Sequence, residues 1–143
     1  MRSAVDTNVI SALLAKHPAA ETAEKLLFAA RSEGAMVICG PVYAELLAQR
    51  SVTVKFLDDF LLLTGISLEV DMGKDVWERA GLCFKAYAQR RKESGGGDAR
   101  RILADFVIGA HAGMRADRLL TFDREGYELD FPDLVILDTA PSD

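Results

Sequence analysis

The segment MRSAVDTNVISALL (residues 1–14) sets the architecture of this chain. The apolar pair Ala4 and Val5 predicts a short strand. Apolar residues then recur at helical spacing over 9–14, behind Thr7 and Asn8, either of which can cap a helix. The segment therefore predicts a strand, a tight turn that holds Asp6, and a helix.

The same alternation continues along the chain. Short apolar runs beside glycine or proline are typical of buried parallel strands, and longer amphipathic segments are typical of the helices that cover them. Further strands are predicted at 36–39, 66–70, 119–121 and 134–137, and further helices at 19–32, 42–48, 52–63, 75–92 and 102–112. The pattern predicts an α/β fold, a three-layer α/β/α sandwich with a mainly parallel central sheet and right-handed crossovers. With 143 residues, we expect a single domain over residues 1–143.

Composition narrows the class of protein. Half of the residues are hydrophobic and 27% are charged, which is the balance of a packed globular chain. No apolar run approaches the roughly 20 residues of a membrane span. Asp6 stands where a signal peptide would need apolar residues, so a cytoplasmic location is expected. Cys39 and Cys83 lie in apolar surroundings and are expected to be reduced core thiols without a chemical role.

Four acidic residues fall where a parallel sheet would gather them. Asp6 follows the first strand and Asp123 follows the strand at 119–121, so both are expected at the carboxyl edge of the sheet. Glu45 and Asp105 lie in the first turns of helices and could reach the same edge. Packed carboxylates repel one another unless divalent cations neutralise them, and ligation by oxygen alone favours Mg²⁺ or Mn²⁺.

Four motifs carry a resemblance to a known family. They are Val-Asp-Thr-Asn-Val-Ile at 5–10, Pro-Val-Tyr-Ala-Glu-Leu at 41–46, Ala-Asp-Phe-Val-Ile-Gly-Ala-His-Ala at 104–112 and Leu-Leu-Thr-Phe-Asp-Arg at 119–124. In order and interval they resemble the PIN-domain nucleases, specifically the VapC-type ribonuclease toxins of toxin–antitoxin pairs. The resemblance covers the whole chain and implies a PIN-like fold.

The resemblance also implies an activity, a cofactor and partners. It assigns the matching acids Asp6, Glu45, Asp105 and Asp123 to one or two Mg²⁺ or Mn²⁺ ions that activate water for hydrolysis of an RNA phosphodiester in tRNA, rRNA or mRNA. It gives Thr7, Asn8 and Thr121 the task of supporting these acids. It further implies a cognate antitoxin protein and a homodimer, with helices near 52–63 in the contacts.

A basic segment offers a way to hold RNA despite the net charge of −5. Five positive charges stand against Glu93 and Asp98 around the glycines 95–97, a local balance of 5 − 2 = +3. The segment is expected to follow RNA phosphates. Its members are Arg90, Arg91, Lys92, Arg100 and Arg101. Arg124, next to Asp123, could also approach the substrate phosphate, or serve as a structural partner of an acid.

Other readings of the same residues stay open. Any one of the acids could be only a helix cap or a solvated helix residue, but that does not explain the ordered set of four. A metal-dependent phosphatase of the haloacid-dehalogenase type would need a second aspartate where Asn8 stands, and a response-regulator receiver would need a lysine after a late strand. A catalytically weak PIN-like domain that only binds RNA or a protein is the alternative without enzyme activity.

Overall fold

The central sheet of the molecule is parallel throughout. The computed structural model describes residues 1–96 and 100–141, and in these ranges five strands lie in the order β3-β2-β1-β4-β5. Each neighbouring pair runs in the same direction. The strands are β1 (Arg2–Val5), β2 (Ala35–Cys39), β3 (Ile66–Glu69), β4 (Arg118–Leu120) and β5 (Ile136–Leu137).

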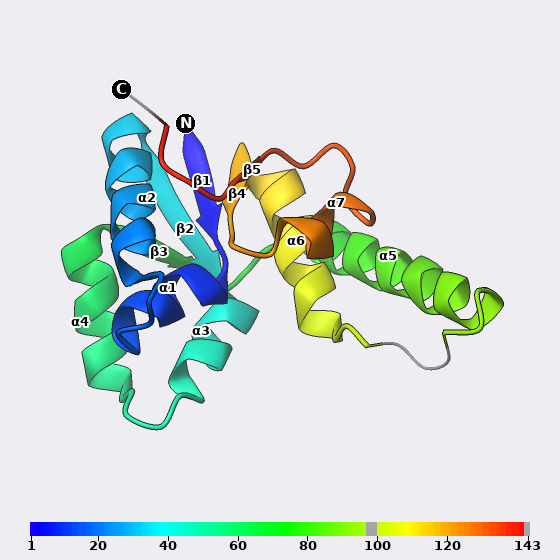
Figure 1. Ribbon diagram of the computed structural model, residues 1–143, viewed down its shortest axis with the longest axis horizontal. Coiled ribbons are helices and arrows are strands. Elements are labelled where there is room, and N and C mark those ends of the chain that lie inside the picture. The colour runs from blue at the N-terminus through cyan, green and yellow to red at the C-terminus, as the bar shows by residue number, and fades with distance from the viewer. Residues whose placement is uncertain (97–99, 142–143) are drawn as a thin grey trace.

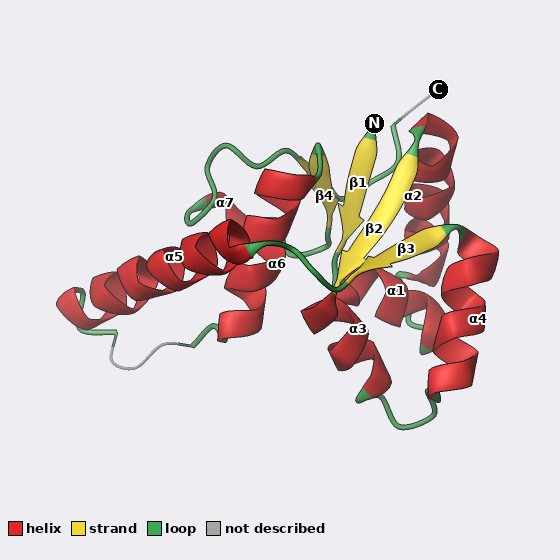
Figure 2. Ribbon diagram, turned by 180° about the vertical axis from the view of Figure 1, so that it is seen from behind, coloured by secondary structure: helices red, strands yellow, loops and turns green. Residues whose placement is uncertain are grey.

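Helices cover both faces of this sheet, so the predicted α/β/α sandwich is confirmed. Right-handed crossovers place the helices between β1 and β3 on one face and those after β3 on the other, and the two groups stand apart in Figure 1 and Figure 2. The first group is α1 (Thr7–Leu14), α2 (Ala20–Glu33), α3 (Gly40–Leu47) and α4 (Val54–Thr64). The second group is α5 (Lys74–Glu93), α6 (Leu103–Arg115) and α7 (Arg124–Glu128).

The strand order reverses between β1 and β4. The chain leaves β1 toward β2 and β3, then returns to place β4 on the opposite side of β1, with Val5 paired to Leu120. The Asp6 amide continues this ladder with a 2.9 Å hydrogen bond to the carbonyl oxygen of Leu120. Parallel sheets open a crevice outside their carboxyl ends at such a switch point, and ligands bind there.

The core on the second face is aromatic. Phe106 of α6 packs edge-on against Phe84 of α5, with ring centroids 5.1 Å apart, and also contacts Tyr87 and Phe131. These contacts fix α6, and with it Asp105, against α5 and the segment after α7. On the first face, burial of Cys39 raises the pKa of its thiol to about 12, which agrees with the expected inert role.

The structure differs from the sequence-based expectations mainly at element ends. Asp6 caps α1, where Thr7 or Asn8 was expected, because its carboxylate accepts from the Thr7 amide while its backbone stays extended. The five-residue helix α7 was not predicted. Gly97 and Asp98, part of the predicted basic loop, lie outside the described residues. Within the described ranges, none of the helices is long and apolar enough to cross a membrane.

Candidate active site

The four predicted acids meet in one cavity at the switch point. Asp6, Glu45, Asp105 and Asp123 line a cavity of about 330 Å³ together with Thr7, Asn8 and Ser11. Asp6 comes from the β1–α1 junction, Glu45 from α3, Asp105 from the first turn of α6 and Asp123 from the β4–α7 junction. In Figure 2 the arrowhead of β1 points toward α3, the end of the sheet where these segments meet. We call this space the carboxylate cleft.

Asp6 is the most enclosed of the four acids, with only 6% of its surface exposed. Its Oδ2 accepts hydrogen bonds from the Thr121 hydroxyl at 2.8 Å and from the Tyr127 hydroxyl at 2.9 Å, and its Oδ1 accepts from the Thr7 amide at 2.7 Å. Burial nevertheless raises the pKa of Asp6, and the charge of Asp105 raises it further. Binding of a proton or a cation would therefore stabilise the buried carboxylate of Asp6.

The three supporting residues named from the family resemblance all contact the acids. The Thr7 hydroxyl donates to Glu45 Oε1 at 2.7 Å and so ties α1 to α3. The Asn8 amide lies 3.5 Å from Asp6 Oδ2 and 3.3 Å from the Thr121 hydroxyl. Thr121 is fully buried, and its hydroxyl oxygen also accepts from the Asp123 amide at 3.0 Å. Thr121 therefore connects the two acids that follow β1 and β4.

Arg101 lies among the acids rather than on a separate RNA-binding surface. Its Nη1 donates to Asp123 Oδ2 at 3.1 Å, its Nη2 is 3.8 Å from Asp105 Oδ2, and its guanidinium stacks 5.3 Å from the centre of the Tyr127 ring. Burial opposes its charge, but the hydrogen bond to Asp123 and the charges of both acids raise the pKa of Arg101. Within the described residues its Nε is buried without a hydrogen-bond partner. Arg101 is thus an internal counter-ion of the cleft.

The chemistry of the cleft suits a hard divalent cation. Its charged donors are carboxylates, and carboxylate oxygens are the ligands of Mg²⁺ and Mn²⁺. In the described part of the chain, no three acidic, histidine or cysteine side chains already converge as a metal cage. Mg²⁺ usually keeps several waters and binds through one or two carboxylates plus substrate phosphates, so such a cage is not required. The residues present therefore fit this ion.

The other predicted RNA-binding residues are not among those that line the cleft, and two of them are held by acids. Arg90 pairs with Asp130, and Arg124 pairs with Asp138 at 3.0 Å and also approaches Glu128. Arg91 contacts the Gly96 carbonyl, while Lys92 and Arg100 are exposed. Lys92 and Arg100 are therefore presented to solvent together with Arg90, which is held by Asp130.

Tyr127 is the site residue that the sequence did not reveal. It is 1% exposed and donates from α7 to Asp6. Its position four residues after Asp123 gives no signal of this contact, because α7 is only five residues long and has no clear periodicity. Only the fold, which returns α7 over the β1–β4 edge, brings the hydroxyl to the acid.

The fold and the cleft define a class of protein, a parallel α/β domain with an acidic, oxygen-lined cavity at its topological switch point. The sequence matches the family model of the PIN domain over residues 4–140. The chain belongs to the PIN-domain family, whose members are generally nucleases that use divalent metal ions. No match is found among curated proteins.

Solved structures with similar folds agree with this assignment. VapBC-1 from nontypeable Haemophilus influenzae aligns with a TM-score of 0.65 and 21% identity, covering 96% of this chain and 98% of that one. VapBC2 from Rickettsia felis, bound to a DNA fragment from its promoter, aligns with a TM-score of 0.64 and 19% identity over the same shares. FitAcB from Neisseria gonorrhoeae aligns with a TM-score of 0.58 and 20% identity, covering 95% and 96%. At these identities, the alignments establish the shared fold.

Proposed function

We propose that this protein is a Mg²⁺- or Mn²⁺-dependent endoribonuclease, the toxin of a toxin–antitoxin pair. The observation that carries the proposal is the convergence of Asp6, Glu45, Asp105 and Asp123, from four separate segments, on one cavity at the β1–β4 switch point. The VapBC proteins among the structural neighbours support the toxin role. An RNA substrate fits the cytoplasmic location expected from the sequence.

The four carboxylates would hold the ion or ions. A bound divalent cation would supply an acidified water and neutralise charge on the phosphate. Thr7 keeps Glu45 turned into the cleft, and Thr121 with Tyr127 orients Asp6. Arg101 is placed to contact a non-bridging phosphate oxygen, because its guanidinium already lies between Asp105 and Asp123. A water activated by the bound ion would serve as the nucleophile, so the reaction needs no side chain for that role.

The partners are part of the same proposal. Leu62 and Leu63 on α4 are 82% and 77% exposed, and Phe28 on α2 is 76% exposed. Phe28 and Leu63 line one common surface hollow, and contiguous exposed apolar side chains are typical of contact surfaces. We assign them to the antitoxin or to a second copy of the chain in a homodimer, in line with the antitoxin role that the resemblance implies.

Cleavage of RNA with and without metal tests the proposal. We expect endonucleolytic cuts in total RNA or tRNA with Mg²⁺ or Mn²⁺, and none after EDTA. Asp105→Asn should abolish cleavage and weaken Mn²⁺ binding measured by calorimetry, because a ligand is lost. Asp133→Asn changes an exposed acid outside the cleft and should match the wild type in both measurements.

Two results would contradict the proposal. Equal activity in EDTA would exclude a metal-dependent reaction. Metal and RNA binding without any cleavage would favour the alternative, a PIN-like module that only binds RNA or protein. The haloacid-dehalogenase alternative is disfavoured by Asn8, whose amide supports Asp6 and Thr121 where that chemistry needs an aspartate.

A further inference from the structure

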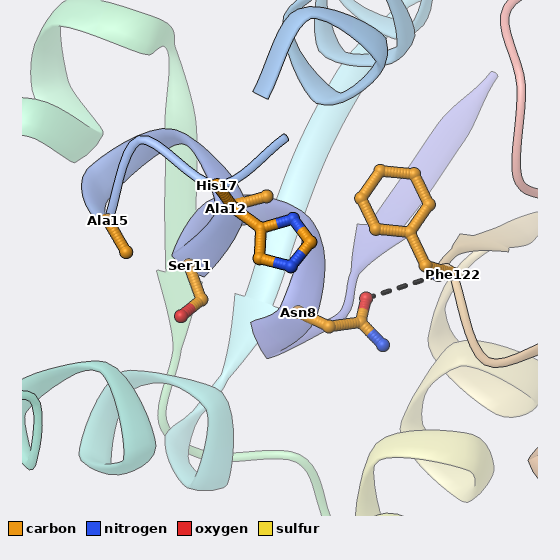
Figure 3. A pocket seen from close by; sticks show the side chains of 6 residues that line it. All are labelled: Asn8, Ser11, Ala12, Ala15, His17 and Phe122. Atoms are coloured by element: carbon orange, nitrogen blue, oxygen red, sulfur yellow. Dashed lines mark hydrogen bonds between the residues drawn. The ribbon is translucent and has the colours of Figure 1, made fainter. Parts of the chain in front are cut away.

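A second cavity opens beside the carboxylate cleft. It has a volume of about 300 Å³ and is drawn in Figure 3. Its walls are Asn8, Ser11, Ala12, Ala15, His17 and Phe122. The first four recur at three- and four-residue spacing, so they share one side of α1 and its C-terminal end. Asn8 and Ser11 also line the carboxylate cleft, so the two cavities adjoin along α1.

We propose that this cavity, which we call the base pocket, binds the nucleobase next to the phosphate that is cleaved. The inference rests on the proposed ribonuclease function and specifies how its substrate is held. A chain whose phosphate lies at the carboxylates must place a neighbouring nucleotide near Asn8 and Ser11. The base pocket is the apolar space that such a nucleotide meets there.

Two flat rings give the base pocket its chemistry. Figure 3 shows the imidazole of His17 and the phenyl ring of Phe122 facing the same space, with Asn8 between α1 and the loop that carries Phe122. Aromatic side chains bind unpaired bases by stacking, and RNA-binding proteins use them in this way. The remaining wall, Ala12 and Ala15, is small enough to leave room for a planar ring.

The described lining of the base pocket contains no lysine or arginine. A phosphate group needs such cations or metal ions, and the pocket extends along the side of α1 from Asn8 to the C-cap Ala15. Its lining therefore favours the base of a nucleotide over its phosphate. The phosphate is left to the cleft, where a cation and Arg101 can meet it.

Phe122 is fixed by a residue that also supports the acids. The Phe122 amide donates to Asn8 Oδ1 at 3.2 Å, the bond dashed in Figure 3, while the Asn8 amide group donates toward Thr121 and Asp6. Asn8 therefore couples the position of the aromatic ring to that of the carboxylates. A base stacked on Phe122 would stand at a defined distance from the cleft.

His17 is held over the base pocket by an uncommon backbone conformation. α1 ends with the two hydrogen bonds of a Schellman motif, from the His17 amide to the Ala12 carbonyl at 3.0 Å and from the Lys16 amide to the Leu13 carbonyl at 3.4 Å. The left-handed position of this motif usually holds glycine, but here it holds Lys16 with φ 52°. Lys16 is therefore strained, and the turn that contains it directs the chain back so that His17 lies beside α1.

Two polar atoms remain available to a base. His17 Nδ1 accepts from the Ala19 amide at 3.0 Å, so the neutral ring carries its proton on Nε2. Ser11 Oγ accepts from Gln49 at 2.6 Å and keeps its own hydroxyl proton. Both groups can donate, which suits the carbonyl or ring-nitrogen acceptors on the edge of a nucleobase.

Nucleotide binding followed by NMR tests the base pocket without relying on cleavage. The probes are the four nucleoside 5′-monophosphates and ribose 5-phosphate, titrated into the full chain with labelled alanine methyl groups. We expect nucleotides to shift the methyl signals of Ala12 and Ala15, because a stacked base adds its ring current there, and ribose 5-phosphate to leave them unmoved. Phe122→Leu should weaken this binding about fivefold or more, while Phe122→Tyr should retain it.

Controls separate a missing ring from a damaged fold. Trp77→Leu removes an exposed ring on α5, outside the base pocket and the carboxylate cleft, and should bind nucleotides as the wild type does. Equal binding by the Phe122→Leu variant and the wild type, or equal shifts with ribose 5-phosphate, would overturn the assignment. So would unmoved methyl signals with every nucleotide, which would leave the pocket to an apolar side chain of a protein partner. Nucleotide binding without RNA cleavage would overturn the proposed function and leave the base pocket standing.

Discussion

Asp6 combines a structural and a chemical task. It caps α1 by accepting a hydrogen bond from the Thr7 amide. It also accepts hydrogen bonds from two buried hydroxyl groups, those of Thr121 and Tyr127. Hydrogen bonds to a charged carboxylate stabilise it by about 1.5–3 kcal/mol each. They also fix its rotamer, which sets the direction of its remaining lone pairs. The hydroxyl of Tyr127 is thus a positioning group for the cleft.

Replacing Tyr127 with phenylalanine removes this hydroxyl and retains the ring. We expect Mn²⁺ affinity and RNA cleavage to fall roughly 10- to 100-fold, as is usual when a group that orients a metal ligand is lost. Tyr43→Phe is the matched control, because the Tyr43 hydroxyl donates to Asp58, which is not part of the cleft lining. Calorimetry and a cleavage assay measure both variants. Equal losses in the two would show that Tyr127 has no special role.

For single residues, the sequence predicts which acids meet in the cleft better than it predicts which side chains contact them. Asp6 and Asp123 follow strands that pair in parallel, so their meeting followed from the topology alone. The prediction that Arg101 contacts RNA stays a prediction, but its pairing with Asp105 and Asp123 was not foreseen, because it depends on how the chain before α6 returns over the cleft. Contacts such as these depend on loop paths and rotamers, which local sequence patterns do not encode.

Helix α6 connects the cleft to the core on the second face. Asp105 lies in its first turn and accepts from the Ile102 amide, while Gly109 faces the ring of Phe131 one turn later. A Cβ atom at Gly109 would stand 2.4 Å from that ring. The glycine therefore allows the close approach of the segment after α7, which in turn holds Tyr127.

Substitution by alanine at two glycines of α6 should change the stability of the fold in opposite directions. Gly109→Ala should destabilise the fold by about 1–3 kcal/mol, because it overpacks the core. The Cβ atom added by Gly113→Ala would have no neighbour within 4 Å. This substitution should stabilise the fold by about 0.5–1 kcal/mol, because alanine favours the helix. Chemical unfolding followed by circular dichroism gives both values. Destabilisation of similar size in both variants would contradict this account.

The elements themselves were largely predictable, and their ends were not. Every predicted strand is present, as is every predicted helix, among them α5, which buries Val76 and Ala80. β5 has only two residues and α7 only five, too short for a hydrophobic period to appear. Tertiary contacts, of β5 with β4 and of α7 with Asp6, determine where these short elements form.

Under the proposed function, the charge distribution would govern how the whole molecule binds RNA. The chain carries a net charge of −5, and several of its arginines are paired with acids, among them Arg90, Arg101 and Arg124. Exposed Lys92 and Arg100 are better placed to contact phosphates along the strand. Phosphate contacts of this kind weaken steeply with salt, because counterions are released on binding.

The double substitution Lys92→Ala with Arg100→Ala should reduce the salt dependence of RNA binding. For two lost contacts to a single strand, the slope of log K against log salt should become shallower by about 1.4. Fluorescence anisotropy in the Asp105→Asn background measures binding without cleavage. Lys25→Ala with Lys55→Ala removes two exposed charges on α2 and α4 and should leave the slope unchanged. An identical slope in all proteins would refute this role of Lys92 and Arg100.

The pairing of β1 with β4 also determines when the carboxylate cleft can form during synthesis of the chain. Hydrogen bonds from Thr121 and Tyr127 reach Asp6 across 115 and 121 positions. On the ribosome, Asp6 is made 115 residues before Thr121 and 121 residues before Tyr127. Such distant contacts form late, since the chain between them must first be ordered. A nascent chain therefore holds Asp6 long before it can form the carboxylate cleft.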